Sequence, residues 1–155
     1  MSKKEDIYKI TAIVLLFDQI IKLLINHALE INQIINIIPG FFSIVYVKNT
    51  GAAFSILENN TVLLVILSVI VIIILDRYIK KEKDFSKMDI LSLGLILGGI
   101  FGNLIDRIIH HGVIDYLSFA FFNYSFPIFN LADMAITGGV LVLLLSMLLK
   151  KKERR

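Results

Sequence analysis

The chain contains no cysteine among its 155 residues, and charged residues make up only 19% of it. Without cysteine it can form no disulfide, no thiolate metal site and no cysteine nucleophile. The shortage of charge accompanies 57% hydrophobic residues and a mean hydropathy of +0.80. Soluble domains carry about 45–50% apolar residues on a similar count. The composition therefore indicates an integral membrane protein, and the length suits a single domain.

Motifs typical of several enzyme classes are missing. There is no His-Glu-x-x-His zinc motif. His27, His110 and His111 would lie on one side of the membrane, but the adjacent pair would point to different faces of a helix. No G-x-S-x-G pattern marks a serine hydrolase, and neither a Walker loop nor a dinucleotide fingerprint is present. We therefore expect no metal, no nucleotide and no other cofactor.

Four apolar runs are long enough to cross a bilayer, which takes about 20 residues in a helix. They are Ile10–Ala28, Thr61–Ile79, Met88–Ile105 and Leu131–Leu149. Polar residues interrupt the first run, and the third is rich in glycine, which permits close packing between helices. The first run begins like a signal peptide, but no small-residue cleavage site follows it, so we expect it to be retained. The predicted fold class is a membrane protein with four transmembrane helices, in one domain over residues 1–155.

Basic residues predict the orientation of these spans. Three groups, at the two ends of the chain and between the second and third runs, hold 13 of the 16 basic residues. Their members are Lys3, Lys4 and Lys9; Arg77, Lys80, Lys81, Lys83 and Lys87; and Lys150, Lys151, Lys152, Arg154 and Arg155. With four spans all three groups lie on one side, which the positive-inside rule identifies as cytoplasmic. The pI near 9.1 then reflects topology, and the lack of interleaved aromatic residues gives little support to binding of nucleic acid.

Two long loops fall on the opposite side. The first covers about residues 26–60 and includes "NIIPGFFSIVYVKNTGAAFSI"; the second covers about residues 106–130 and includes "VIDYLSFAFFNYSFPIF". Their β-branched and aromatic residues favour short strands, and aromatic residues at this depth suit a membrane interface. We therefore expect a small β-structure on the outer membrane surface.

Polar residues gather near the outer ends of the spans. They are Asp18, Lys22, Asn49, Asp106, Arg107, Asp115, Asn130 and Asp133. Asp18 and Lys22 lie four residues apart on one helix face, so we expect them to form an ion pair. Asp106 and Arg107 are expected to cap the outer end of the third span, where a structural role is the simpler interpretation. Ionisable residues near hydrocarbon are costly and usually functional, and this cluster is therefore a candidate site.

Asp115 and Asp133 are the two residues of this cluster that suggest a reaction. A loop of 17 residues separates them, long enough to fold back and bring the carboxylates together. Two neighbouring carboxylates share a proton, and so supply a base to activate water and an acid to protonate a leaving amine. A second interpretation is that Asp133 interacts with the dipole of a helix N-terminus while Asp115 is a solvated loop residue. The residues alone leave both open.

Five short motifs give a more specific indication. They are "FDQIIK" at 17–22, "VKNTGAAFS" at 47–55, "GGIFGNLIDRI" at 98–108, "GVIDYL" at 112–117 and "FNLADMAI" at 129–136. In their order and spacing these resemble the motifs of bacterial lipoprotein signal peptidase, also called signal peptidase II. The resemblance covers all four predicted spans and both outer loops. One departure is Tyr116, where many members have Phe.

This resemblance implies an aspartyl endopeptidase of the bacterial cytoplasmic membrane, acting at the extracytoplasmic face. Its substrates would be prolipoproteins carrying a diacylglyceryl-modified cysteine, cleaved just before that cysteine. By the same resemblance Asp115 and Asp133 are the catalytic residues. Six residues fall on the substrate site: Asn49, Gly99, Asn103, Arg107, Asn130 and Ala132. Asp18, Lys22 and Asp106 are supporting residues, and no metal or cofactor is implied.

The resemblance also implies a small extracytoplasmic β-cradle and a short lid-like helix resting on the membrane. The segments "ALEINQIINIIPGFFSIVYV" and "NTGAAFSILEN" would supply them. We expect a monomer in contact with membrane lipid.

Two other classes of function compete with this one. A small four-span cation or proton-coupled transporter would use Asp18 to bind its ion, and a structural assembly subunit would tolerate Asp115→Asn. Transporters of this size place the essential carboxylate in the middle of a span and connect the spans by short loops. Here the carboxylates gather at one surface beside two long loops, which favours an enzyme that acts at that surface.

Overall fold

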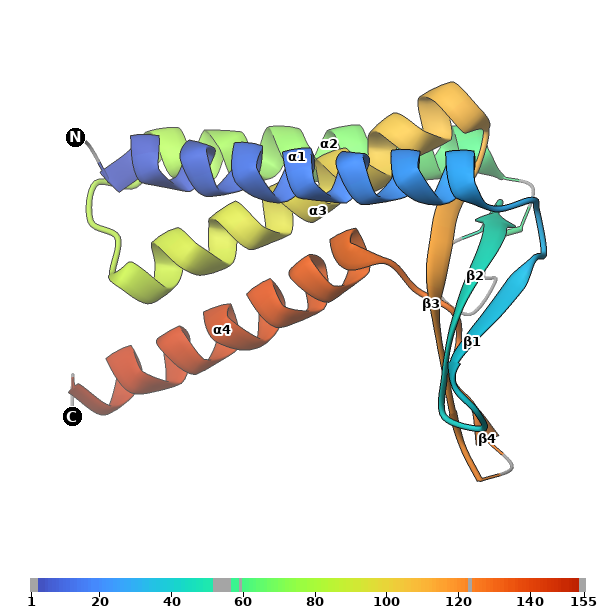
Figure 1. Ribbon diagram of the computed structural model, residues 1–155. Helices are drawn as coiled ribbons and strands as arrows, with labels where there is room; N and C mark the ends of the chain where they lie inside the picture. The colour runs from blue at the N-terminus through green and yellow to red at the C-terminus, as the bar shows by residue number, and fades with distance from the viewer. Residues whose placement is uncertain (1–2, 52–56, 59, 123, 154–155) are drawn as a thin grey trace.

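The computed structural model describes residues 3–51, 57–58, 60–122 and 124–153. Four helices run roughly lengthwise, and a four-stranded sheet lies across one end of them (Figure 1). The helices are α1 (Lys3–Ala28), α2 (Thr61–Lys81), α3 (Lys87–His110) and α4 (Leu131–Glu153). The strands are β1 (Ile34–Ile38), β2 (Phe42–Asn49), β3 (Val113–Phe121) and β4 (Tyr124–Ser125).

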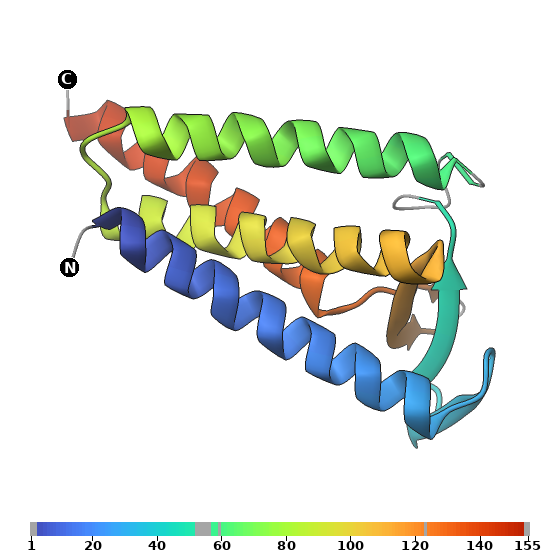
Figure 2. The ribbon, with the colours of Figure 1, turned by 90° about the horizontal axis from the view of Figure 1, so that it is seen from above.

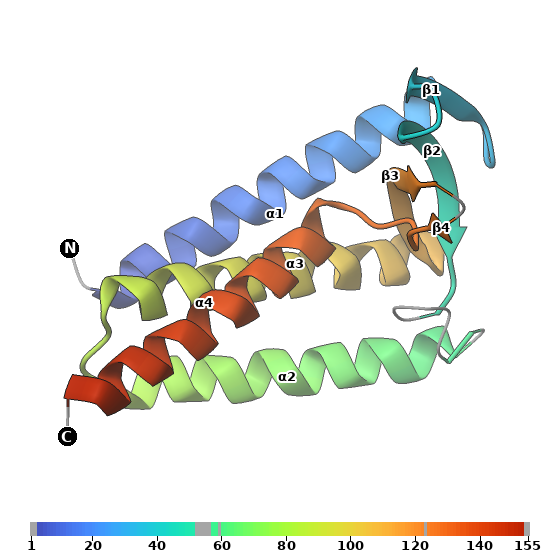
Figure 3. The same cartoon turned by 90° about the horizontal axis from the view of Figure 1, so that it is seen from below.

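Helix α3 is the centre of the bundle. It lies between α1 and α2, and α4 packs against it from a further side (Figures 2 and 3). Its glycines allow this close packing: a Cβ on Gly98 would lie 2.6 Å from Cβ of Val14 in α1, and one on Gly139 of α4 would lie 2.7 Å from Cγ1 of Ile96. The glycine-rich run thus serves helix packing, as the sequence predicts.

Within the described residues, three helices are long and apolar enough to cross a membrane, namely Thr61–Lys81, Lys87–His110 and Leu131–Lys150. The first predicted span corresponds to α1, which is 26 residues long but carries more charged residues than these three. Two of its charged side chains, Asp18 and Lys22, are buried inside the bundle. Helix α2 is the reverse case, because most of its apolar side chains are exposed and only Leu64 and Ile79 are buried.

The sheet has the order β1-β2-β3-β4, and all its neighbours are antiparallel. The prediction of strands in both outer loops is therefore confirmed. Leu29, Tyr46, Ile114 and Tyr116 form a buried cluster where the sheet meets α1. Farther out, Phe119 stacks on Phe42 with ring centroids 4.8 Å apart. This packing holds β3 at a fixed level above the helix ends.

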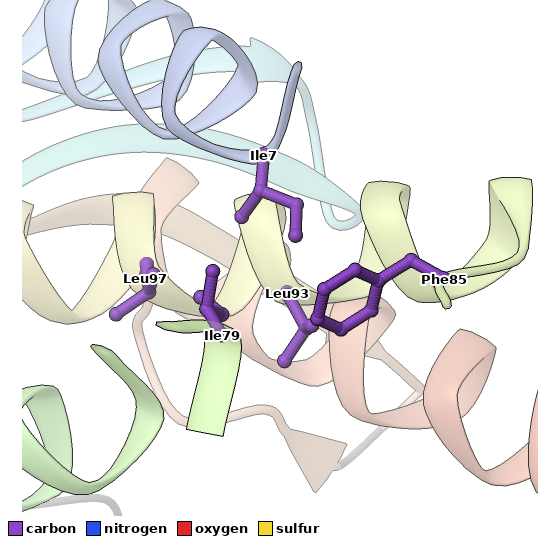
Figure 4. Close-up of a cluster of buried hydrophobic side chains, with 5 residues drawn as sticks. All are labelled: Ile7, Ile79, Phe85, Leu93 and Leu97. Atoms are coloured by element: carbon purple, nitrogen blue, oxygen red, sulfur yellow. The ribbon is translucent and has the colours of Figure 1, made fainter. Parts of the chain in front are cut away.

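The opposite end of the bundle holds both chain termini and the connection from α2 to α3 (Figure 1). A buried apolar cluster closes it, made of Ile7, Ile79, Phe85, Leu93 and Leu97 (Figure 4). Ser86 caps α3 through a reciprocal capping box with Asp89, whose carboxylate also accepts hydrogen bonds from Ser146 and Lys150 of α4. The described members of the three basic groups thus belong to segments that end or connect at this end.

Helix α3 extends beyond the predicted third span. The span was predicted to end at Ile105, with Asp106 and Arg107 capping its outer end, whereas the helix continues to His110 and holds both residues within its last turns. Both side chains make polar contacts at this level: Arg107 donates to the carbonyl of Gly51, and Asp106 accepts the N–H of Ile114 in β3. The segment expected to form the lid-like helix includes residues 52–56 and 59, which lie outside the described residues.

Substitution of Gly98 tests the packing of α1 on α3. In Gly98→Leu the new side chain collides with Val14, and we expect a loss of about 1–3 kcal/mol in the free energy of unfolding. The control is Gly138→Ala, whose new Cβ meets nothing within 4 Å. Thermal unfolding in detergent should show a lower Tm for Gly98→Leu only. An unchanged Tm would contradict the close approach of these helices.

Candidate active site

A cavity of about 900 Å³ opens between the sheet and the helix ends. Strands β2 and β3 and helices α2, α3 and α4 all contribute to its wall. Five of the residues predicted from the sequence line it: Asn49, Asn103, Arg107, Asp115 and Asp133. The folding of the second outer loop thus brings the two aspartates to one cavity, as the sequence suggests.

Asp115 is held by the pairing of β3 with β2, in which it lies opposite Val47. Its side chain is buried, and both oxygens accept hydrogen bonds: Oδ2 from Nδ2 of Asn49 at 3.0 Å and Oδ1 from Nδ2 of Asn130 at 2.7 Å. Burial raises the pKa of Asp115 to about 7, and the negative charge of Asp133 adds to the rise. At neutral pH this carboxyl can therefore carry a proton.

Asp133 stands at the N-terminus of α4 and forms a reciprocal cap with Asn130. Its N–H donates to Oδ1 of Asn130 at 2.9 Å, and the N–H of Asn130 donates to its Oδ2 at 3.2 Å. The second oxygen, Oδ1, accepts from Nδ2 of Asn103 at 2.8 Å. Both oxygens of Asp133 thus accept N–H donors at the N-terminus of α4. Asp133 therefore caps α4, as the second interpretation predicted, and also faces the cavity. Asp115 is buried in β3 and is not the solvated loop residue of that interpretation, and a catalytic role for the pair stays a prediction.

Asn130 joins the two aspartates. It is completely buried, and its Nδ2 donates to Asp115 as well as to Oδ1 of Asn103, 3.2 Å away. Its Oδ1 is occupied by the N–H of Asp133, which fixes the orientation of the amide. One side chain thus positions a carboxyl from the sheet and a carboxylate from a helix.

A buried charged cluster lies behind the cavity. Nζ of Lys22 is 2.9 Å from a carboxylate oxygen of Asp18 and 2.9 Å from one of Asp106, so the predicted ion pair is confirmed and has a third member. Asp18 also accepts the N–H of Ala132 at the start of α4, and Asp106 accepts the N–H of Ile114 in β3. The cluster therefore connects α1 and α3 to both elements that carry the aspartates.

Arg107 lies at the edge of the cavity. Its Nη2 donates to the carbonyl of Gly51 at 3.2 Å and its Nη1 to the carbonyl of Asn103 at 3.4 Å. Its Nε is buried and has no hydrogen-bond partner among the described residues. The guanidinium thus retains donor capacity next to the two aspartates.

Gly99 and Ala132 occupy a different position from the other predicted residues of the substrate site. A Cβ on Gly99 would lie 2.7 Å from Cγ1 of Ile136, and it would collide with the carbonyl of Ala132. Both residues therefore serve the contact of α3 with α4 beside the cavity. Their part in substrate binding stays a prediction.

Gln19 and Gly102 belong to the site although the sequence alone gave them no role. Nε2 of Gln19 donates to Oδ1 of Asp106 at 3.1 Å, and the absence of a side chain on Gly102 leaves room for the carboxylate of Asp18. A polar residue next to Asp18 in an apolar run was the available signal for Gln19. Nothing comparable marked Gly102 among the other glycines.

Tyr116 makes a contact that a phenylalanine cannot make. Its hydroxyl accepts the N–H of Leu131 at 3.1 Å, which satisfies a donor at the start of α4. Burial raises the pKa of Tyr116 to about 12, so the hydroxyl stays neutral. The departure from the family pattern therefore adds one more tie between β3 and α4.

The protonation of Asp115 can be measured directly. We expect an infrared band of a protonated carboxyl that disappears as the pH rises through about 7, because Asp115 is the buried member with the raised pKa. Asp115→Asn should remove this band. Absence of such a titrating band from the unmodified protein, or its persistence in the variant, would contradict the assignment.

Comparison with known proteins places this geometry in context. The family model described as Signal peptidase (SPase) II matches residues 10–149. A lipoprotein signal peptidase of Listeria monocytogenes serotype 4a (strain HCC23) is 43% identical over 141 residues, covering 88% of this chain and 89% of that protein. One from Listeria welshimeri is 41% identical with the same coverage.

Solved structures agree with the sequence relatives. A bacterial membrane enzyme superposes with a TM-score of 0.86 at 31% identity, over 94% of this chain and 89% of the other. A second bacterial membrane enzyme gives a TM-score of 0.80 at 32% identity, over 90% of each chain. These matches cover most of the chain, and the chain belongs to the signal peptidase II family.

Proposed function

We propose that this protein is an aspartyl endopeptidase that removes the signal peptide from diacylglyceryl-modified prolipoproteins by cleaving just before the lipidated cysteine. The observation that carries the proposal is the joining of Asp115 and Asp133 by Asn130 at one cavity, in a chain of the signal peptidase II family. A proton-bearing carboxyl beside a carboxylate is the pair that hydrolysis of a peptide bond requires.

The two aspartates differ in environment, and this difference assigns their roles. We take Asp133, which is less buried than Asp115 and stands in the first turn of α4, as the base that removes a proton from water as the water attacks the scissile carbonyl. Asp115, with its raised pKa, donates a hydrogen bond to that carbonyl oxygen. When the C–N bond breaks, the leaving amine takes a proton from the dyad and the new carboxyl product departs. Asn49 and Arg107 line the same cavity with donors that can orient the substrate backbone.

The cavity extends from the dyad along the first turns of α4 to Thr137 and Gly138, and on the other side to Ser68 of α2. These deeper residues belong to helices that are apolar enough to span a membrane. A signal peptide or an acyl chain could therefore enter from the lipid while the scissile bond remains at the surface. Partitioning of the diacylglyceryl group into the bilayer would hold the bond close to the dyad.

We further propose that α1 also spans the membrane, giving four spans in a single domain with both termini in the cytoplasm. Its 26 residues would extend about 39 Å at about 1.5 Å per residue, which exceeds the hydrocarbon thickness. The charges that lower its hydropathy are paired inside the bundle and do not face lipid. The basic residues near the chain termini and in the α2–α3 connection lie at the end opposite the sheet, which the positive-inside rule places in the cytoplasm of a bacterial cell.

Ion transport is not supported by the comparisons, and the structure leaves Asp18 poorly suited to it. The side chain is completely buried, with one oxygen bound to the N–H of Ala132 and the other to Lys22. A transported cation would have to displace the ammonium of Lys22. We accordingly place this protein among surface-acting enzymes, as a monomer that works in contact with lipid.

Cleavage of a prolipoprotein tests the proposal. Purified protein in detergent should shift the mobility of a prolipoprotein only after diacylglyceryl transfer, with or without a chelator. Asp115→Asn and Asp133→Asn should each reduce turnover by about 10²–10⁴-fold, because each removes one half of the acid–base pair. The matched control is Asp84→Asn, which alters an exposed carboxylate at the opposite end of the molecule.

Three results would count against this function. They are cleavage of the unmodified precursor at the same rate, loss of cleavage on adding the chelator, and substantial turnover in either dyad variant. Retained secondary structure and an unchanged elution volume in gel filtration must accompany the loss of activity, so that misfolding is separated from chemistry.

A further inference from the structure

Lys22 has one more partner than an ion-pair role requires. The side chain is 2% exposed, and its three N–H donors meet three oxygens at 2.9 Å, those of Asp18, Asp106 and Asn103. The two carboxylates already neutralise the ammonium. The third contact, to the amide of Asn103, leads toward the cavity, because Asn103 lies between Lys22 and Asp133.

This contact fixes the orientation of the Asn103 amide. A side-chain amide offers an oxygen that accepts and an NH₂ that donates, and either can face a given neighbour. An ammonium has only donors, so the oxygen of Asn103 must face Lys22. The NH₂ group is then directed to Oδ1 of Asp133, 2.8 Å away. Nδ2 of Asn130 donates to the same Asn103 oxygen at 3.2 Å, which agrees with this orientation.

We propose that Lys22 is a positioning residue of the reaction, which orients the amide of Asn103 so that it donates to Asp133 and keeps that aspartate as the ionised member of the dyad. The inference rests on the proposed function and extends it to a residue that does not reach the cavity. Without the ammonium only the longer contact with Nδ2 of Asn130 holds the amide in this orientation. An amide that turns over presents its oxygen to Asp133, and this oxygen accepts a hydrogen bond from the protonated carboxyl. The reversed amide favours the protonated aspartate, which cannot act as the base.

Other charged groups around the dyad set the background for this effect. They are Asp18 of α1, Lys48 of β2, Glu58 before α2, Asp106 and Arg107 of α3, and Asp115 of β3. Arg107 and Lys48 line the cavity, and neither is among the ion-pair or hydrogen-bond partners of Lys22. A change in pH dependence on replacing Lys22 must therefore be compared with a variant that alters the charge of the same cluster while leaving Asn103 oriented.

The test compares Lys22→Met with Asp106→Asn in cleavage of the diacylglyceryl-modified prolipoprotein, measured as kcat and KM across pH. Asp106→Asn removes one partner of the ammonium but leaves its contacts with Asp18 and Asn103. For Lys22→Met we expect the acid limb of kcat to move up by about one pH unit, which is about a tenfold loss on the acid side. KM should stay within a factor of about two, and Asp106→Asn should keep the acid limb of the wild type.

A double variant identifies the route of the effect. If Lys22 acts through Asn103, adding Lys22→Met to Asn103→Ala should move the acid limb no further than Asn103→Ala alone. Independent, additive shifts would overturn the proposal. So would a Lys22→Met enzyme whose acid limb matches that of the wild type, whatever its total activity, because a purely structural ion pair alters the amount of folded enzyme and not its pH profile.

Loss of Lys22 leaves two buried carboxylates without their cation, so Lys22→Met can fail to fold. In that case Lys22→Met/Asp106→Asn removes one positive and one negative charge together, and Asp106→Asn is its matched control. The same shift of the acid limb is expected between these two. Equal acid limbs would overturn the proposal. Cleavage by the wild-type protein is required throughout, and its absence would instead refute the proposed function.

Discussion

The structure depends on the burial of ionisable groups at the level where apolar helices end. Asp18, Lys22, Asp106 and Asp115 are all at least nine-tenths buried. An isolated charge in such a place is too costly to persist, so each must have partners. The three charged groups of the Lys22 cluster satisfy one another, and Asp18 and Asp106 also accept backbone N–H groups from the start of α4 and from β3. The need to satisfy these charges thus fixes how the sheet and α4 meet the bundle.

The same contacts set the relative position of the two aspartates at the cavity. Asp115 is carried by a strand and Asp133 by a helix, so neither element alone could set their separation. Asn130 bonds to both, and the hydroxyl of Tyr116 ties β3 to the first residue of α4. Both elements are also anchored to the Lys22 cluster. A site built from several elements in this way can hold one carboxyl deeply buried in a strand and the other at the less buried N-terminus of a helix, which is the asymmetry that acid–base chemistry needs.

Much of this could be predicted from the sequence, because hydropathy and residue spacing report on single elements. The apolar runs predicted three of the helices, and the aromatic loops predicted the strands. A spacing of four residues predicted the ion pair of Asp18 and Lys22. The resemblance to signal peptidase II, now supported by relatives over most of the chain, indicated which aspartates would meet.

Contacts between elements were the part that the sequence could not give. That Asp106 completes the Lys22 cluster, that Gly102 leaves room for Asp18, and that Tyr116 caps α4 all depend on side chains brought together from distant parts of the chain. The end of α3 was misplaced for a related reason: hydropathy follows the lipid boundary, whereas the helix continues into a polar contact with the sheet. Orientation of an amide, as at Asn103, leaves no trace in the sequence at all.

The proposed function requires Asp115 and Asp133 to act as one unit. Single-turnover cleavage rates of Asp115→Asn, Asp133→Asn and the double variant test it most directly. Residues that share one chemical step are strongly non-additive, so the double variant should be about as slow as either single variant. A double variant slower by the product of the two single effects would show that the aspartates act independently, which would contradict a shared catalytic dyad.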